Sequence, residues 1–264
     1  MSWKKQISLL LVGLCIGYML VVLLMYTQQE FFIYYPSQQP FGDCPQLPGF
    51  EPKILSDFAR GYYLAHEADT AKITVVYHGN AGSACHRSYM LPVLQQKNTS
   101  IFIAEYPGYS DHHLQPTKAN FLQMVYDVID FLDQQNYTQT QILGESLGTA
   151  VSAYHAKNAD VKSLVLISPF PSLQDVARIH YSFLPVRLMQ RNNFQTQQWL
   201  KNYEGSVQII VAENDRIVPP SLSKKLYDNL NASHKEFHSI SDTTHNTIWS
   251  SPEIEDIILA ISKS

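Results

Sequence analysis

The chain has 264 residues, of which 45% are hydrophobic and 16% charged, which is enough for a substantial core in one large domain or two small ones. A formal net charge of -4 provides no basic surface, so we expect no nucleic-acid partner. Three cysteines are too few for a disulfide scaffold, and the sequence has neither a CxxC pair nor an HExxH motif. We therefore expect no metal site and no cofactor.

The first element is an uncharged apolar run from Ile7 to Tyr26, which reads ISLLLVGLCIGYMLVVLLMY. At 1.5 Å per residue a helix of this length spans roughly 30 Å, the thickness of a bilayer core. A cleaved signal peptide has a shorter apolar region that ends in a small-x-small site, whereas this run ends in MYTQQE. The pattern predicts an uncleaved membrane anchor over residues 1–26, with membrane contact through residues 7–26.

The basic residues beside the anchor predict its orientation. Lys4 and Lys5 precede the span, and the next basic residue is Lys53. The positive-inside rule then places the N-terminus in the cytoplasm and the remaining chain across the membrane, in the periplasm of a bacterium or in the lumen or exterior of a eukaryotic cell. Gly13 and Gly17 form a GxxxG spacing, which allows a weak homodimer but is also common in single membrane helices.

Residues 27–52 are proline-rich and predict an irregular connector, and residues 53–264 then predict one globular domain. Within the domain, apolar strand patterns alternate with amphipathic helical patterns, which is typical of a mostly parallel sheet flanked by helices. The predicted strands are Ile73–His78, Ser100–Tyr106, 140–146, Val161–Pro169, Ser206–Asn214 and His234–Ser241, with an antiparallel pair over residues 53–66. The predicted helices are Lys118–Gln135, Gly148–Lys157, Leu222–Leu230 and Ile254–Ser262.

An insertion over residues 170–203 interrupts this alternation with about thirty residues that contain no strand pattern. At this position in an α/β enzyme, the segment forms either a cap over the active site or a plain pair of surface helices. The sequence leaves both alternatives open.

Polar residues gather where the predicted parallel strands end, which is where open α/β sheets place their sites. The first strand ends in HGNAG, the third in GESLG around Ser146, and the fifth in END at Asp215, while the sixth leads to THN at His245. Serine, aspartate and histidine thus follow the chain order of an α/β-hydrolase triad. A serine hydroxyl needs a base, histidine titrates near neutrality, and the aspartate orients the imidazole.

The turn glycines would let the nucleophile occupy a sharp elbow, and the following helix would direct N–H groups at developing negative charge. We expect the oxyanion donors to be the N–H groups of Leu147 and Asn80. Each motif also has a structural interpretation, because a GxSxG stretch is often only a turn and Asp215 can be a turn residue. Their combination at the predicted strand ends favours a triad.

The sequence contains other candidates for the acid and the base. Glu213 is a second candidate acid, whereas Asp242 lies too close to His245 to come from a separate strand end. His234 and His238 are candidate bases, but His234 precedes the strand pattern and His238 lies within it. His155 falls in a predicted helix, where we expect it to pack.

The sequence resembles the α/β-hydrolase superfamily, and within it the membrane-anchored serine hydrolases with an HGNAG oxyanion turn, a group that includes lysophospholipase-like and depalmitoylase-like enzymes. The matching pieces cover nearly all of the chain after the anchor: FIYYPS, VVYHGNAG, EYPGYS, GESLGTAVSAY, SPFPSLQDVA, HYSFLPVRLM, ENDRIVP and THN. The resemblance implies Ser146 as nucleophile, Asp215 as acid and His245 as base. Two loops depart from the family pattern, VAEND in place of HGxxD and DTTH in place of GxGH.

These observations predict a membrane-tethered serine hydrolase that cleaves an ester or thioester of a lipid-like or small acyl substrate through an acyl-enzyme. The same triad would also serve a peptidase or amidase, and a third alternative is a non-catalytic binding protein on the hydrolase fold. If the domain faces an oxidising compartment, Cys44 and Cys85 can pair, although Cys85 can equally be a buried thiol.

Overall fold

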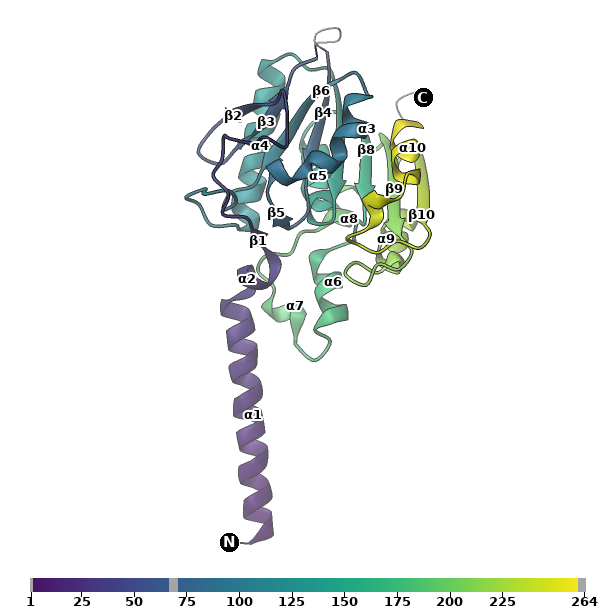
Figure 1. Ribbon diagram of the computed structural model, residues 1–264. Coiled ribbons are helices and arrows are strands. Elements are labelled where there is room, and N and C mark those ends of the chain that lie inside the picture. The colour runs from purple at the N-terminus through teal and green to yellow at the C-terminus, as the bar shows by residue number, and fades with distance from the viewer. Residues whose placement is uncertain (1, 67–70, 261–264) are drawn as a thin grey trace.

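The computed structural model describes residues 2–66 and 71–260, in which a globular body stands on one long N-terminal helix (Figure 1). That helix, α1 (Trp3–Thr27), is the one helix of the described residues that is long and apolar enough to cross a membrane, with a mean hydropathy of 2.8 and no buried residue. The predicted span therefore forms a single helix with the expected length and composition.

The body is built on an eight-stranded sheet with the order β10-β9-β8-β7-β4-β6-β3-β2. The strands are β2 (Glu51–Ile54), β3 (Arg60–Leu64), β4 (Lys72–Tyr77), β6 (Ser100–Glu105), β7 (Gln139–Glu145), β8 (Val161–Ile167), β9 (Ser206–Ala212) and β10 (His234–Ile240). The pairings of β2 with β3 and of β3 with β6 are antiparallel, and the others are parallel. This agrees with the predicted sheet and with the antiparallel pair over residues 53–66.

Helices cover both faces of the sheet because neighbouring residues of each central strand point to opposite sides. Val75 belongs to a core with α4, α5 and α9, whereas Val76 belongs to a second core with α3 and α10. The bounds are α3 (Leu91–Gln95), α4 (Lys118–Gln134), α5 (Leu147–Asn158), α9 (Pro220–Asp228) and α10 (Glu253–Ala260), with 3-10 helices η1 (Ala84–Met90) and η2 (Ile248–Ser250). The part of the last predicted helix beyond Ala260 lies outside the described residues.

The insertion over residues 170–203 folds into the three short helices α6 (Leu173–His180), α7 (Val186–Met189) and α8 (Thr196–Trp199). Helices α6 and α7 lie below the carboxyl ends of the strands, on the side from which α1 extends (Figure 1). Trp199 of α8 is instead buried in the core that contains α5. The insertion thus combines a cap-like pair of helices with a segment that belongs to the body.

The predicted connector is more ordered than its prolines suggest. It contains α2 (Gln29–Ile33) and the strand β1 (Tyr35–Pro36), which pairs in parallel with β5 (Ala81–Gly82). Tyr34 and Leu47 are buried in the two cores of the body. Burial of these large side chains stabilises the fold, and the segment therefore packs against the domain instead of remaining exposed.

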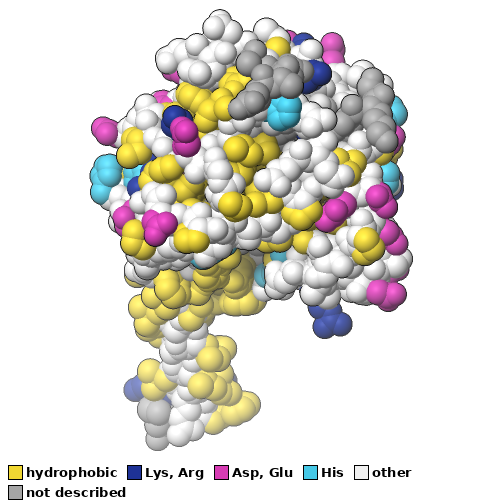
Figure 2. Space-filling view, turned by 45° about the horizontal axis from the view of Figure 1, so that its top comes forward, with side chains coloured by type: hydrophobic (Ala, Val, Ile, Leu, Met, Phe, Trp, Pro, Cys, Tyr) yellow, Lys and Arg dark blue, Asp and Glu magenta, His cyan; other side chains and the backbone are white. Residues whose placement is uncertain are grey.

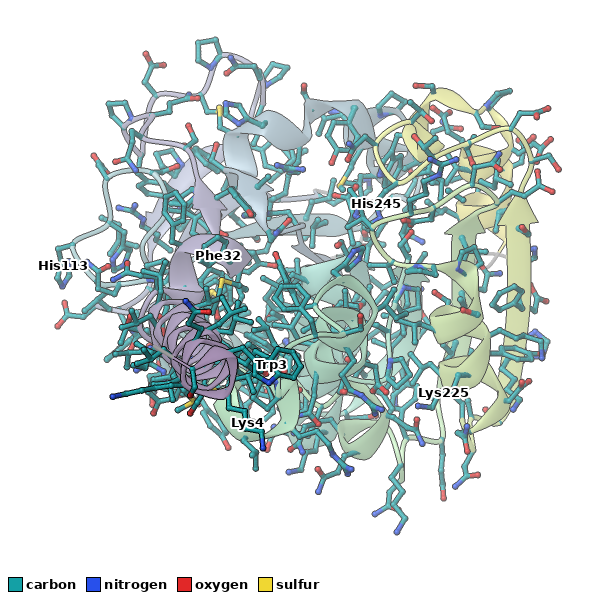
Figure 3. All side chains as sticks on the ribbon, turned by 90° about the horizontal axis from the view of Figure 1, so that it is seen from below. Trp3, Lys4, Phe32, His113, Lys225 and His245 are labelled. Atoms are coloured by element: carbon teal, nitrogen blue, oxygen red, sulfur yellow. A yellow bond between two sulfur atoms is a disulfide. The ribbon has the colours of Figure 1, made fainter. Side chains whose placement is uncertain are left out.

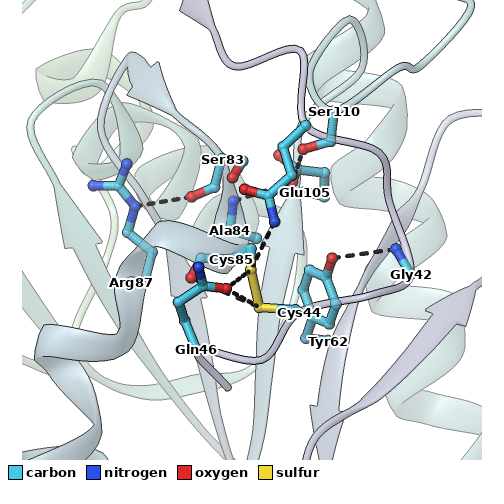
Figure 4. Close-up of a disulfide and its surroundings, with 11 residues drawn as sticks. Gly42, Cys44, Gln46, Tyr62, Ser83, Ala84, Cys85, Arg87, Glu105 and Ser110 are labelled. Atoms are coloured by element: carbon cyan, nitrogen blue, oxygen red, sulfur yellow. Dashed lines mark hydrogen bonds between the residues drawn. A yellow bond between two sulfur atoms is a disulfide. The ribbon is translucent and has the colours of Figure 1, made fainter. Parts of the chain in front are cut away.

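A disulfide fixes the same segment to the body. Cys44 and Cys85 are bonded with a Cα separation of 5.7 Å, which confirms the pairing considered from the sequence (Figure 4). Cys85 lies in η1, directly after the turn that contains Asn80. Closing a loop of 41 residues stabilises the fold by about 4 kcal/mol in the chain-entropy account.

Candidate active site

Ser146 occupies a sharp elbow between β7 and α5. Its backbone has φ 51° and ψ -116°, a conformation that costs energy for a non-glycine residue and is typical of a nucleophile elbow. The elbow also requires small neighbours. A Cβ on Gly148 would collide with the carbonyl oxygen of Tyr77, and one on Gly144 would lie 2.8 Å from the carbonyl oxygen of Gly148. The glycines of GESLG therefore permit a close crossing of β4 and α5.

Three side chains from separate strand ends form one hydrogen-bonded chain. Ser146 Oγ lies 3.1 Å from Nε2 of His245, and Nδ1 of His245 lies 2.7 Å from Oδ2 of Asp215. Ser146 and Asp215 are almost fully buried. The structure thus brings together the three residues that the sequence predicted for the triad.

The environment of Asp215 keeps its carboxylate charged. Burial by itself raises the pKa of Asp215, but the hydrogen bond and charge of His245, with the N–H of Val218 and the hydroxyl of Ser168, lower it below its ordinary value. Ser168 Oγ donates to Oδ2 at 2.9 Å, and the N–H groups of Ile217 and Val218 donate to Oδ1 at 2.9 and 2.8 Å. Sequence reasoning missed Ser168, although its place at the end of the fourth predicted strand was a usable signal.

The rival residues lie elsewhere. Glu213 accepts a hydrogen bond from the N–H of Asp242, and both His234 and His238 contact Glu236 on β10. His155 is fully buried against the hydroxyl of Tyr77, and burial lowers its pKa to about 3, so it packs as expected. Among the described residues, none of these rivals forms a hydrogen bond with Ser146, Asp215 or His245.

The turn around Asn80 faces the nucleophile with its backbone held in place. The carbonyl oxygen of Asn80 accepts from Tyr35 N at 2.9 Å and from Tyr109 Oη at 2.6 Å, and its side-chain amide donates to the carbonyl of Ile33 at 2.7 Å. Within the described part of the chain the N–H of Asn80 meets no acceptor. Leu147, as the first residue of α5, has no carbonyl one turn earlier for its own N–H.

Two cavities meet at the triad and share Asn80, Ala81, Ser146, His245 and Asn246. The first, here called the apolar lobe, has a volume of about 470 Å³ and is lined by residues of α2, α6 and the loop after β9, among others. Its further lining side chains are mostly hydrocarbon and include Phe32, Ile33, Phe170, Leu173, Val176, Ala177, Tyr181 and Val218. Figure 3 views this underside along α1 and labels both Phe32 and His245.

The second cavity, here called the polar lobe, has a volume of about 420 Å³ and carries Arg87, Tyr89, Glu145 and Trp249. Tyr89 Oη and Trp249 Nε1 donate to the two oxygens of Glu145 at 2.9 and 3.0 Å. Burial and the Glu145 carboxylate raise the pKa of Tyr89, so its hydroxyl stays protonated and can donate. This ring of side chains was not found from the sequence.

Arg87 connects this ring to the oxyanion turn. Its guanidinium donates to the carbonyls of Ala81 at 2.6 Å and Ser83 at 3.1 Å, and also to Tyr89 Oη at 2.7 Å. It also lies 3.5 Å from Glu145, the residue before the nucleophile. Glu105 supports the turn from behind, where its buried carboxylate accepts from the N–H of Ala84 and the hydroxyl of Ser110.

Solved structures share the overall fold of this chain. A Butyrivibrio proteoclasticus esterase with bound ferulic acid superposes with a TM-score of 0.63 at 16% identity, over 84% of this chain and 96% of its own. A Pyrococcus furiosus esterase superposes with a TM-score of 0.67 at 15% identity, over 88% and 96%. The chain has the α/β-hydrolase fold.

No protein-family model matches the chain, and its sequence relatives are less than 30% identical to it. An uncharacterized protein of Mycobacterium tuberculosis is 28% identical over 215 residues, 78% of this chain and 76% of the relative. Protein bem46 of Schizosaccharomyces pombe is 29% identical over 69% of this chain, and the lysophosphatidylserine lipase ABHD12 of Gallus gallus is 26% identical over 70%. The chain spans only 64% of the length of bem46 and 57% of the length of ABHD12.

Proposed function

We propose that this serine hydrolase cleaves esters of an apolar acyl group with a polar alcohol, and that it does so beside a membrane. The observation that carries the proposal is the hydrogen-bonded chain of Ser146, His245 and Asp215 at the junction of an apolar and a polar lobe. The apolar lobe suits the acyl chain, and the polar lobe suits the alcohol that leaves. The name of the relative ABHD12, a lysophosphatidylserine lipase, is consistent with a lipid ester.

In the first half of the proposed reaction, Ser146 Oγ attacks the carbonyl carbon and its proton passes to Nε2 of His245. The carbonyl oxygen becomes an oxyanion, which the N–H groups of Asn80 and Leu147 stabilise by hydrogen bonding. The C–O bond to the alcohol then breaks, and the alcohol leaves with the proton from His245. An acyl-enzyme on Ser146 remains.

In the second half, water loses a proton to His245 and attacks the acyl carbon, and the Ser146 ester bond breaks as Oγ takes that proton back. The products are a carboxylic acid and free enzyme. Throughout the cycle Asp215 holds the imidazole by Nδ1 and stabilises its positive charge. A thioester would follow the same steps with a thiol as the leaving group, and thioester cleavage is part of the proposal.

Labelling with a fluorophosphonate tests the nucleophile, because the probe reacts with an activated serine. We expect the wild-type chain to be labelled and to hydrolyse p-nitrophenyl butyrate, and Ser146→Ala to do neither while remaining folded by circular dichroism. Ser168→Ala is the matched control, since this nearby serine also has a positive φ and touches the triad but does not face the lobes. Labelling of Ser146→Ala at the wild-type level would contradict the mechanism.

The apolar α1 fits a membrane anchor, and we propose that the body lies across the membrane from the N-terminus. The disulfide between Cys44 and Cys85 supports this orientation, because disulfides persist in oxidising compartments. A reporter fused after residue 264 should be active outside the cytoplasm, and activity only in the cytoplasm would reverse the assignment. No side chain would meet a Cβ placed on Gly13 or Gly17, so the helix has room for a second copy, and weak dimerisation stays a prediction.

A further inference from the structure

The underside of the body, beside α1, carries large apolar side chains that no other part of the described chain covers. Leu188 is 87% exposed, Phe31 is 73% exposed, and Phe183 is 62% exposed. They come from α7, α2 and the turn between α6 and α7. Isolated exposed apolar residues are ordinary, but a group of them on one face marks an interaction surface.

This surface is continuous with the membrane-spanning helix. Tyr18 of α1 donates to the carbonyl of Phe183 at 3.0 Å, and the amide of Gln29 donates to the carbonyl of Met189 at 3.3 Å. Arg191 then pairs with Glu30 at 3.0 Å. Yellow apolar side chains extend from α1 onto the base of the body in Figure 2. A bilayer that surrounds α1 would therefore meet α6 and α7 at the point where α1 leaves it.

The charges around the surface fit lipid head groups. The segment from α6 to Arg191 carries Arg178 and Arg187 as further exposed cations, while its acid, Asp175, is paired with Lys225. Apolar side chains next to arginines are the pattern of segments that lie in the membrane interface.

The apolar lobe opens toward this surface. Phe32, Ala177 and Tyr181 line the lobe below Ser146, and the same three residues line a smaller apolar pocket between the end of α1 and α7. A path lined mainly by hydrocarbon therefore runs from the nucleophile to the junction of α1, α6 and α7.

We propose that the α6–α7 segment inserts into the lipid bilayer beside α1, so that the apolar lobe takes the acyl chain of a lipid ester directly from the membrane. The occupant of the surface is thus the bilayer, and the entry route rests on the proposed ester hydrolysis. The alcohol part of the lipid would remain in the polar lobe, above the head groups.

Spin-label depth measurements on the full chain in phosphatidylcholine vesicles test the insertion. A nitroxide on Leu188→Cys, with Cys15→Ser to remove the free thiol, should be reached by oxygen and protected from a water-soluble nickel chelate. The control label is on Thr138→Cys, at an exposed position directly before β7, and should be open to the nickel chelate. Equal nickel access at both positions would overturn the proposal, and so would spin–spin broadening at Leu188, which would place a second copy there.

Activity on two substrates tests the entry route. In the double variant Phe183→Asp and Leu188→Asp, hydrolysis of p-nitrophenyl palmitate in the vesicles should fall at least fivefold, while hydrolysis of soluble p-nitrophenyl butyrate stays unchanged. Ile54→Asp, an exposed apolar position on β2, should change neither rate. Unchanged palmitate hydrolysis in the double variant would overturn the route, whereas a wild-type chain inactive on both esters would overturn the proposed function instead.

Discussion

In the polar lobe, Arg87, Tyr89, Glu145 and Trp249 are joined by hydrogen bonds that connect the three elements η1, β7 and η2. In the apolar lobe, by contrast, the walls come from α2, α6 and the loop after β9, and the side chains that face the cavity are mostly hydrocarbon. Directional bonds define positions closely, while apolar packing tolerates changes of shape. Under the proposed function, the polar lobe would hold the reacting groups in place, and the apolar lobe would select the acyl chain.

The largest effect should come from a substitution of His245, which lines both lobes. His245→Ala removes the base, and we expect kcat for esters of every chain length to fall by roughly 10⁴–10⁶, because triad members act as a unit. Asp215→Asn should cost less, since the proton acceptor stays in place. Steady-state kinetics on C2 to C16 p-nitrophenyl esters measures both. Glu213→Gln is the control, and an effect larger than that of Asp215→Asn would reassign the acid.

The next effect should come from breaking the polar lobe alone. Arg87→Met removes the donors to the carbonyls of Ala81 and Ser83, so the oxyanion turn loses two of its supports. We expect kcat to fall roughly 10- to 100-fold with little change in KM, in line with the loss of an oxyanion-hole contact. Tyr89→Phe keeps the guanidinium of Arg87 in place, and its kcat should fall only a few-fold. A rise in KM at constant kcat would instead make Arg87 a substrate-binding residue.

A large side chain in the apolar lobe should lower the activity on long-chain esters and leave the activity on short-chain esters unchanged. In Ala177→Trp, an indole would occupy the path beneath Ser146, and we expect kcat/KM for C12 to C16 esters to fall about tenfold while C2 and C4 esters are unaffected. This corresponds to a little over 1 kcal/mol, a common energy for a few methylene groups in a pocket. Ala177→Ser is the size-matched control. A uniform loss at all lengths would show that the substitution disturbs the triad rather than the lobe.

The smallest effect concerns acid stability. The lowered pKa of Asp215 means that its stabilising charge is complete above about pH 4, the ordinary value for aspartate, and is lost as the pH falls through the folded pKa. Asp215→Asn should therefore lose less stability than wild type below pH 4, by at most about 1.4 kcal/mol per pH unit. Urea unfolding between pH 3 and 6 measures the difference, and parallel curves would contradict it.

The sequence could predict features that depend on local patterns. Apolar strand patterns that alternate with helical patterns predicted the sheet, and the turns at the strand ends predicted Ser146, Asp215, His245, Asn80 and Leu147 as site residues. The Cys44–Cys85 bond could only be considered, since pairing depends on distance. Arg87, Tyr89 and Trp249 could not be found, because the bonds from Tyr89 and Trp249 to Glu145 join elements whose relative placement the sequence does not state. The burial of Tyr34 in the core could not be predicted either, because the prolines around it indicated an irregular connector.

The pairing of β1 with β5 determines where the body of this protein can be separated from α1. Tyr35 and Ser37 donate their N–H groups to the oxyanion turn, and the side chain of Gln29 accepts from the N–H of Arg191. A replacement for α1 is therefore best joined between Thr27 and Gln29. A different anchor or a solubility tag joined there keeps the turn that faces Ser146, whereas one joined after Pro36 would retain the triad but remove a strand from its oxyanion turn.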